Sequence, residues 1–126
     1  MVDGHSVIHA TDWLAEIHEN HQESGRLALI RELTEFQNRR GYYVVLVFDG
    51  KGFHRGKEGG TEKDVLVLYS KTGESADEVI ERLAVKHGMK HAVNVVSNDR
   101  LVLDSCAVSG AFGMSVRSMW ELIERS

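Results

Sequence analysis

One segment of the chain has the character of a β-strand that is buried on both faces. Residues 42–48 are apolar without interruption and rich in β-branched and aromatic side chains, a composition typical of central strands in a parallel sheet. Two further segments, 64–69 and 92–96, are also predicted to be strands, because they are rich in apolar, β-branched residues. A fragment of strand is expected before Asp3 and a short last strand over 111–114.

Helical patterns separate these strands. In residues 23–40 apolar side chains recur every three positions, and Gly41 is a typical C-terminal stop. Residues 75–87 open with a capping box, and further helices are expected over 98–108 and from 115 onward. Helices that alternate with buried strands indicate βαβ crossovers, so the sequence predicts an α/β fold with a parallel sheet.

The composition is that of one globular domain. The chain has 126 residues, of which 42% are hydrophobic and 27% charged, and this length predicts a single domain over residues 1–126. The one cysteine, Cys106, excludes an internal disulfide and is expected to be a small core residue in a reducing, cytoplasmic setting. No apolar run approaches the ~20 residues that cross a bilayer, and the N-terminus lacks a signal-peptide pattern. No membrane association is expected.

Four aspartates follow the expected strands. Asp3 and Asp49 come directly after a strand, Asp77 lies in the first turn of the helix after the next one, and Asp99 comes soon after another. Each alone is explained by a turn or a helix cap. The carboxyl ends of parallel strands meet at one edge, however, and crowded carboxylates repel one another unless a cation lies between them. The repeated placement predicts a site for Mg²⁺ or Mn²⁺.

A divalent ion held by carboxylates indicates phosphoryl-transfer chemistry. The ion lowers the pKa of a bound water and neutralises charge that develops on a scissile phosphate, so no side-chain nucleophile is required. Ser6, Ser97 and Asn98 lie close in sequence to the aspartates and are candidates for positioning water or phosphate oxygens. Ordinary turn and cap hydrogen bonds explain Ser97 better.

A glycine- and lysine-rich segment, residues 51–63, interrupts the alternation of strands and helices. It is expected to be a long loop, and long loops are often functional. Lys51, Arg55 and Lys57 are candidates for contacts with a phosphate backbone, as is Arg100, although a solvated polar loop explains the segment equally well. The formal net charge of −4 argues weakly against a protein that coats a nucleic-acid duplex.

Five segments, in this order, carry a resemblance to a known family. They are Val2-Asp3-Gly4-His5-Ser6-Val7-Ile8, Val45 to Gly50, Tyr69 to Leu83, Val95 to Arg100, and Gly110 to Ser115. Together they resemble the NYN domain in the YacP-like branch of the PIN-like superfamily. The third segment is the most specific, because a glycine–glutamate turn precedes a helix that starts with alanine and aspartate.

The resemblance implies a PIN-like, Rossmann-type parallel sheet flanked by helices on both faces. It also implies a metal-dependent endoribonuclease that acts on single-stranded RNA with Mg²⁺ or Mn²⁺. Asp3, Asp49, Asp77 and Asp99 match the acidic positions of the family. Asp3, Asp77 and Asp99 are the expected metal ligands, with Asp49 supporting them directly or through water. Some members of this branch are linked to ribosomes, so the ribosome is a candidate partner.

The chain departs from the family pattern near its first acidic residue. His5 and Ser6 stand where the family usually has an aromatic residue and an asparagine. This departure and the net charge of −4 favour an alternative, a non-catalytic RNA- or ribosome-binding module. A receiver domain is a weaker alternative, because Asp3 has no acidic neighbour and residues 111–114 contain no lysine. Only two residues precede Asp3, so the first strand is expected to be short.

Overall fold

The computed structural model describes residues 1–50, 56–58 and 65–126, with the backbone alone for 56–58. Six strands and six helices lie in this part of the chain. In chain order they are β1 (Val2–Asp3), α1 (Gly4–Ala10), α2 (Asp12–Asn20), α3 (Gln22–Arg40), β2 (Val45–Phe48), β3 (Gly56–Glu58), β4 (Leu66–Tyr69), α4 (Ala76–His87), β5 (Asn94–Val96), α5 (Arg100–Val108), β6 (Phe112–Met114) and α6 (Val116–Glu124).

The strands form one sheet in the order β3-β4-β2-β1-β5-β6. All neighbouring pairs are parallel except β3 with β4, which is antiparallel at one edge. In the centre Val2 of β1 lies opposite Leu46 of β2 on one side and Val96 of β5 on the other. The α/β fold with a parallel sheet is therefore confirmed, and β1 is short, as expected.

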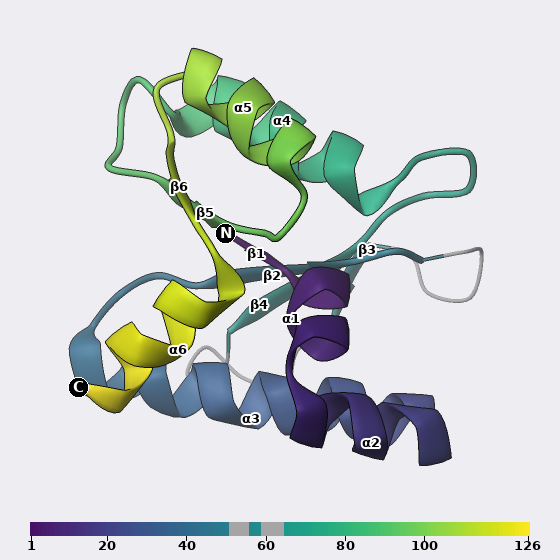
Figure 1. The fold of residues 1–126 in the computed structure, drawn as a ribbon. Helices are drawn as coiled ribbons and strands as arrows, with labels where there is room; N and C mark the ends of the chain where they lie inside the picture. The colour runs from purple at the N-terminus through teal and green to yellow at the C-terminus, as the bar shows by residue number, and fades with distance from the viewer. Residues whose placement is uncertain (51–55, 59–64) are drawn as a thin grey trace.

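Helices cover both faces of the sheet, as predicted (Figure 1). Helices α1, α2, α3 and α6 lie on one face, where Leu29 of α3 packs in a core cluster with Leu46 of β2. Helices α4 and α5 lie on the other, where Ile80 packs with Val47. Adjacent residues of a strand point to opposite faces, so one apolar strand serves both clusters. Cys106 is buried in the second cluster, as the sequence predicts.

The N-terminal region contains two helices that the sequence pattern does not predict. Helix α1 begins at Gly4, directly after β1, with Asp3 as its N-cap. The carboxylate of Asp3 accepts a hydrogen bond from the backbone N–H of Ser6 at 3.4 Å. The pattern Asp-Gly indicates a turn, and a helix that begins on a glycine has no local sequence signal. Helix α2 has nine residues and buries only Leu14, so little of it belongs to the core.

The segment 51–63 is not entirely a loop, contrary to the sequence expectation. Its residues Gly56–Glu58 form β3, in which Gly56 lies opposite Tyr69 of β4. An edge strand is held by backbone hydrogen bonds and is often polar, so apolar alternation does not reveal it. The remainder of the segment lies outside the described residues.

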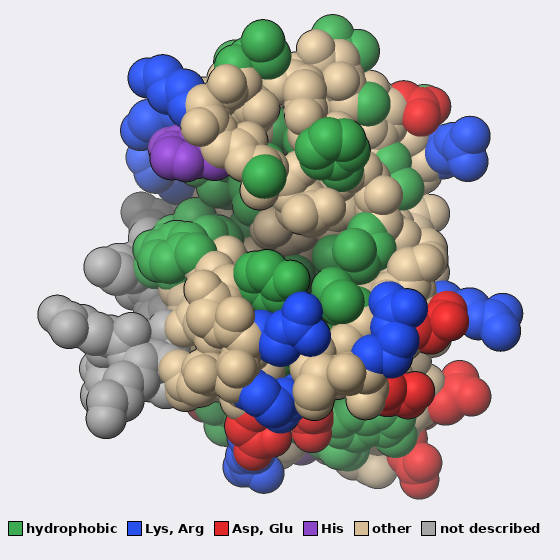
Figure 2. Space-filling view, turned by 90° about the vertical axis from the view of Figure 1, so that its left-hand side faces the viewer, with side chains coloured by type: hydrophobic (Ala, Val, Ile, Leu, Met, Phe, Trp, Pro, Cys, Tyr) green, Lys and Arg blue, Asp and Glu red, His purple; other side chains and the backbone are tan. Residues whose placement is uncertain are grey.

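The face that carries β6 and α6 is partly apolar. Figure 2 shows hydrophobic side chains across the middle of this face, with basic and acidic side chains interspersed below them. The exposed large hydrophobic residues of the structure include Tyr43, which follows α3, and Phe112 in β6. In the described part of the chain, no helix combines the length and apolar character needed to cross a bilayer.

Candidate active site

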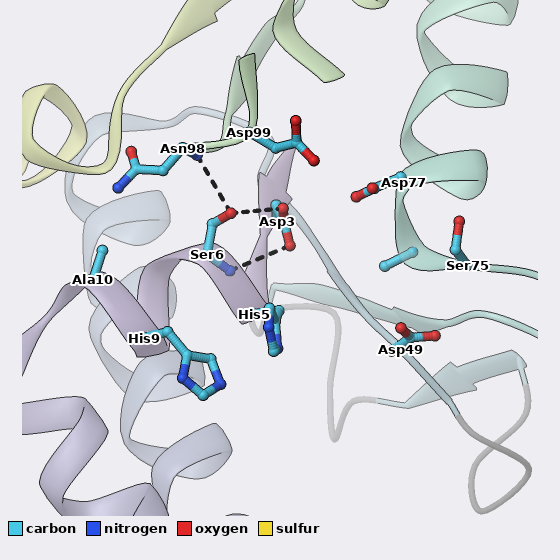
Figure 3. A pocket seen from close by; sticks show the side chains of 11 residues that line it. Asp3, His5, Ser6, His9, Ala10, Asp49, Ser75, Asp77, Asn98 and Asp99 are labelled. Carbon is cyan, nitrogen blue, oxygen red and sulfur yellow. Dashed lines mark hydrogen bonds between the residues drawn. The ribbon is translucent and has the colours of Figure 1, made fainter. Parts of the chain in front are cut away.

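The four aspartates belong to four strands that are neighbours in the sheet. Asp3 ends β1, Asp49 follows β2, Asp77 lies at the start of the helix after β4, and Asp99 caps the helix after β5. All four line one cavity of about 510 Å³ at the carboxyl edge of the sheet (Figure 3). The structure thus brings together residues that are dispersed over nearly the whole chain.

Asp3 is the most buried of the four carboxylates, with 4% of its surface exposed. Its Oδ2 accepts hydrogen bonds from the hydroxyls of Ser6 at 2.8 Å and Ser97 at 3.1 Å. Its Oδ1 accepts from the backbone N–H of Ser6. A buried carboxylate without such donors would be strongly destabilising. These bonds fix the orientation of Asp3 at the floor of the cavity.

Asp49 is exposed and held by one serine. The hydroxyl of Ser70, wholly buried at the end of β4, donates to Asp49 Oδ1 at 2.9 Å. The same hydroxyl accepts a hydrogen bond from the backbone N–H of Gly50 at 3.0 Å. The side chain of Asp49 is therefore oriented from the neighbouring strand, and it lines the cavity.

Asp99 and Asp77 lie at the N-termini of the two helices on one face of the sheet. Asp99 is the N-cap of α5, and its carboxylate accepts from the backbone N–H of Leu101 at 3.0 Å. Asp77 is in the first turn of α4, whose N-cap is Ser75. Ser75 accepts from the backbone N–H of Glu78 at 3.2 Å, so the predicted cap is formed. The capping explanation is thus correct for Asp99 but does not remove it from the cavity.

The pKa of Asp77 is raised above its ordinary value. Partial burial is the largest cause, and the charges of Asp3, Asp99, Glu81 and Asp49 add to it in that order. Within the described part of the chain, none of the four aspartates forms an ion pair with a lysine or arginine. Mutual repulsion without compensation is the electrostatic condition that a bound cation relieves.

Three carboxylates do not converge on one point here. Among the described residues, no group of three or more His, Cys, Asp or Glu side chains could hold a metal ion. The cavity therefore offers carboxylates in pairs or singly. This arrangement fits an ion that keeps most of its water shell, as Mg²⁺ usually does, and not an ion enclosed by protein ligands.

The predicted RNA-binding residues have different positions. Ser6 and Asn98 line the cavity, and the side-chain oxygen of Asn98 accepts from the backbone N–H of Val116 at 3.0 Å. Arg100 is the first residue of α5 but does not line the cavity; its side chain is 87% exposed and lies 3.6 Å from Asp104. Lys51 and Arg55 lie outside the described residues, and only the backbone of Lys57 is described.

A second cavity of about 370 Å³ adjoins the first and shares Asp49 and Ser75 with it. Its wall includes Lys71 and Glu74, from the turn that leads into α4. Glu74 forms an ion pair with Arg82, and this contact is the largest cause of its lowered pKa. The ion pair ties the turn to the second turn of α4, which helps to position the helix that carries Asp77.

Sequence reasoning missed or undervalued several residues of the site. Ser97 is wholly buried and bonded to Asp3, so its role goes beyond the local cap to which the sequence assigns it. Ser70 and the two histidines of the cavity wall, His5 and His9, are not among the candidates that the sequence reasoning names. Ser97 and Ser70 each stand at the end of an apolar strand, and this placement is the one signal that links them with the aspartates.

The parallel sheet and the acidic cavity at its carboxyl edge are the features that the resemblance to the PIN-like superfamily implies. The family described as "YacP-like NYN domain" matches residues 1–126, and the chain belongs to that family. The NYN domain is part of the PIN-like nuclease superfamily, so the class of function is ribonuclease-like and involves RNA.

Relatives of known sequence and structure agree with this assignment. The chain is 30% identical over 128 residues to YacP of Bacillus subtilis (strain 168), with 98% of this chain and 74% of that protein covered. It is similar to the crystal structure of Rae1 (YacP) from Bacillus subtilis, with a TM-score of 0.82, 30% identity, and coverage of 98% of this chain and 72% of that one. A mutant of Rae1 gives a TM-score of 0.81 at 30% identity, over 98% of this chain and 73% of that one.

Proposed function

We propose that this protein is a metal-dependent endoribonuclease that hydrolyses phosphodiester bonds in single-stranded RNA. The observation that carries the proposal is the cavity in which Asp3, Asp49, Asp77 and Asp99 meet, with no lysine or arginine paired to them among the described residues. The similarity to YacP and membership of a nuclease superfamily support it. A cytoplasmic setting is part of the proposal, since RNA is the substrate and the single cysteine is buried.

The donor set of the cavity fits Mg²⁺ or Mn²⁺. Carboxylate oxygens are the hard ligands that these ions prefer, and Mg²⁺ is commonly held by one or two carboxylates and several waters. Of the expected ligands Asp3, Asp77 and Asp99, one or two would hold such an ion directly and the rest through its bound waters, with Asp49 contributing directly or through water. When bound, the ion would supply an activated water and would neutralise charge on the scissile phosphate.

The residues of the chain have separable roles in this proposal. Asp3 is fixed by Ser6 and Ser97 and so presents its carboxylate in one orientation. Asn98 lines the cavity, and its amide N–H groups would donate to a phosphate oxygen while its side-chain oxygen accepts from the backbone N–H of Val116 at the start of α6. The exposed carboxylates of Asp49 and Asp99 are the groups that a hydrated ion would reach first.

The proposal is tested by hydrolysis of an unstructured, end-labelled RNA in Mn²⁺, in Mg²⁺ and in EDTA. Wild type is expected to cleave with either ion and not in EDTA. Asp99→Asn is expected to lower the rate at least ~100-fold, the order of loss when one electrostatic contact to a transition state is removed. Asp104→Asn is a matched control, because Asp104 lies on the same helix with its side chain 68% exposed and outside the cavity.

Equal cleavage by wild type and Asp99→Asn would refute the assignment of the site. Loss of cleavage in Asp104→Asn as well would show that the effect is not specific to the cavity. Stabilisation by the ion is a second readout, since a ligand that binds the folded state alone raises its stability once its concentration exceeds the dissociation constant.

A second candidate function is an RNA- or ribosome-binding module without catalysis. The observation that favours it is the lack, among the described residues, of three side chains that converge on one metal ion. This module would bind the same RNA both as wild type and as Asp99→Asn, and neither protein would cleave it in Mn²⁺ or Mg²⁺.

A further inference from the structure

Three histidine rings follow one another from the acidic cavity along α1 to α2. His5 and His9 are one turn apart on α1, and their ring centroids are 4.2 Å apart. The ring of His18 on α2 continues the series, 5.8 Å from that of His9 and nearly perpendicular to it. His5 and His9 are exposed and line the cavity, opposite the aspartates of the other strands (Figure 3).

We propose that His5, His9 and His18 form a stacking surface for unpaired bases of the RNA strand that enters the acidic cavity. This inference rests on the proposed function and names how its substrate is held. Unpaired bases in RNA are commonly stacked on aromatic side chains, histidine among them. Such stacking is independent of sequence because every base has a π-face.

The described walls of the cavity favour a contact that does not depend on charge. Within the described part of the chain no lysine or arginine lines the cavity, whereas four aspartates do. These described walls repel a phosphate backbone unless a cation is bound. Ring stacking supplies affinity without relying on charge, and it places the bases on the α1 side of the cavity, away from the carboxylates.

The last ring of the series, that of His18, packs against helix α3. Nδ1 of His18 lies 3.2 Å from the carbonyl oxygen of Gln22 at the start of α3. The neighbouring Gly25 is buried and so close to His18 that a Cβ there would lie 2.8 Å from the Cβ of His18. His18 thus sits against α3 and can act as the fixed end of the series, with His9 and His5 toward the cavity.

A transition-metal site is a weaker explanation for the same histidines. Two histidines four residues apart on a helix supply two nitrogen ligands, but structural sites for zinc use four ligands and catalytic sites three. No group of three or more His, Cys, Asp or Glu side chains in the described residues could hold an ion. The exposure of His5 and His9 and the closeness of their rings favour stacking.

The test measures the affinity of a fluorescein-labelled octa-adenylate by fluorescence anisotropy, with EDTA present so that no cleavage occurs. His9→Ala is expected to weaken binding roughly tenfold, within the range for loss of one stacked base. His9→Phe, which keeps an aromatic face, is expected to restore affinity to within about threefold of wild type. His9→Leu keeps an apolar side chain without a π-face and is expected to bind as weakly as His9→Ala.

His91→Ala is the matched control. His87 and His91 form a similar ring pair, 5.8 Å apart, that does not line either cavity. The affinity of His91→Ala for the octa-adenylate is expected to equal that of wild type. Wild-type affinity in His9→Ala, or failure of His9→Phe to bind better than His9→Leu, would overturn the stacking surface. Because His9 is exposed, thermal unfolding of each variant is expected to match wild type, and a variant that fails this check is replaced by the same substitution at His5, which is also exposed and lines the cavity.

The two proposals fail in different ways. If wild type cleaves RNA in Mn²⁺ but the His9 series shows no difference in binding, the stacking surface is wrong and the nuclease stands. If the His9 series behaves as expected but no RNA is cleaved with either ion, the nuclease is wrong and the stacking surface stands as part of a binding module.

Discussion

Ser97 donates its hydroxyl to the carboxylate of Asp3 at 3.1 Å, across 94 positions of the sequence. Both residues are buried, and each stands at the end of a strand in the parallel pair β1 and β5. Ser97 Oγ also accepts from the backbone N–H of Asp99 at 3.0 Å. One hydroxyl therefore connects the two acidic residues, so that the position of Asp3 and the start of α5 depend on the same contact.

Replacement of Ser97 by alanine should destabilise the protein. Asp3 would lose one of its donors, and the N–H of Asp99 would lose its acceptor. Loss of a buried hydrogen bond to a charged group costs about 1–3 kcal/mol in the free energy of unfolding, which urea denaturation measures. Ser105→Ala is the control, because Ser105 is exposed on α5, and it should change stability by less than ~0.5 kcal/mol. Equal effects of the two substitutions would contradict the role given to Ser97.

The raised pKa of Asp77 predicts how the stability of the ion-free protein depends on pH. A carboxyl whose pKa is higher in the folded state than in the unfolded state favours folding at low pH, and this contribution is lost as the pH rises through the folded-state pKa. Asp77→Asn cannot undergo this loss. In EDTA, the Tm of Asp77→Asn minus that of wild type should therefore increase as the pH rises from mildly acidic to neutral.

Mn²⁺ should lower the Tm advantage of Asp77→Asn over wild type. The ion is expected to raise the Tm of wild type more than that of Asp77→Asn, because it relieves the repulsion around an ionised Asp77. Asp104→Asn, outside the cavity, should follow wild type in both series. A Tm difference that stays constant with pH would argue against the repulsion.

Gly4 is the position where a side chain would most directly disturb the site. It follows Asp3, and a Cβ there would overlap the ring of Phe48. Phe48 is buried in β2 and stacks on Tyr69, with ring centroids 5.7 Å apart, so the ring has little room to move. Gly4→Ala should lower the free energy of unfolding by about 1–3 kcal/mol, the usual cost of overpacking.

The overlap can be checked by a double-mutant cycle. Phe48→Leu removes part of the ring that the new methyl group would meet, and alone it leaves a cavity. If the two residues conflict as described, Gly4→Ala should cost less in the Phe48→Leu background than in wild type. Additive effects in chemical denaturation would mean that Gly4 is needed for another reason.

The elements with strong local signals are predictable from the sequence. The apolar strand expected over 42–48 is confirmed from Val45 to Phe48, whereas Tyr42 and Tyr43 precede β2 and are exposed. The stop at Gly41, where φ is 74°, is as expected. Helix α1 is different, since its buried residues Val7 and Ile8 contact elements far along the chain and its first residue is a glycine. Such a helix is stabilised by tertiary packing more than by helix propensity, so the local sequence pattern does not predict it.

The positions of the acidic residues can be predicted from the rule that the carboxyl ends of parallel strands meet at one edge of the sheet. The residues that support them cannot be predicted in this way. Asp3 and Asp49 are found by asking which charged residues come just after buried strands. The contact between Ser97 and Asp3 depends on β1 and β5 being neighbours, and the sequence does not state the strand order. The histidine series likewise requires the unpredicted helices α1 and α2 to lie side by side.

Asn98 allows a structural role to be separated from a role in RNA binding. Its side-chain oxygen accepts from the backbone N–H of Val116, in the first turn of α6, while the residue also lines the cavity. Asn98→Asp keeps the acceptor oxygen and should retain near wild-type stability, but it adds a negative charge beside four aspartates and should weaken RNA binding in EDTA. Asn98→Ala removes the acceptor and should lower the free energy of unfolding by about 1 kcal/mol, the usual cost of a lost cap. Urea denaturation and anisotropy on the same samples would check both effects, and a stability loss as large in Asn98→Asp as in Asn98→Ala would show that the bond to Val116 is not what Asn98 contributes.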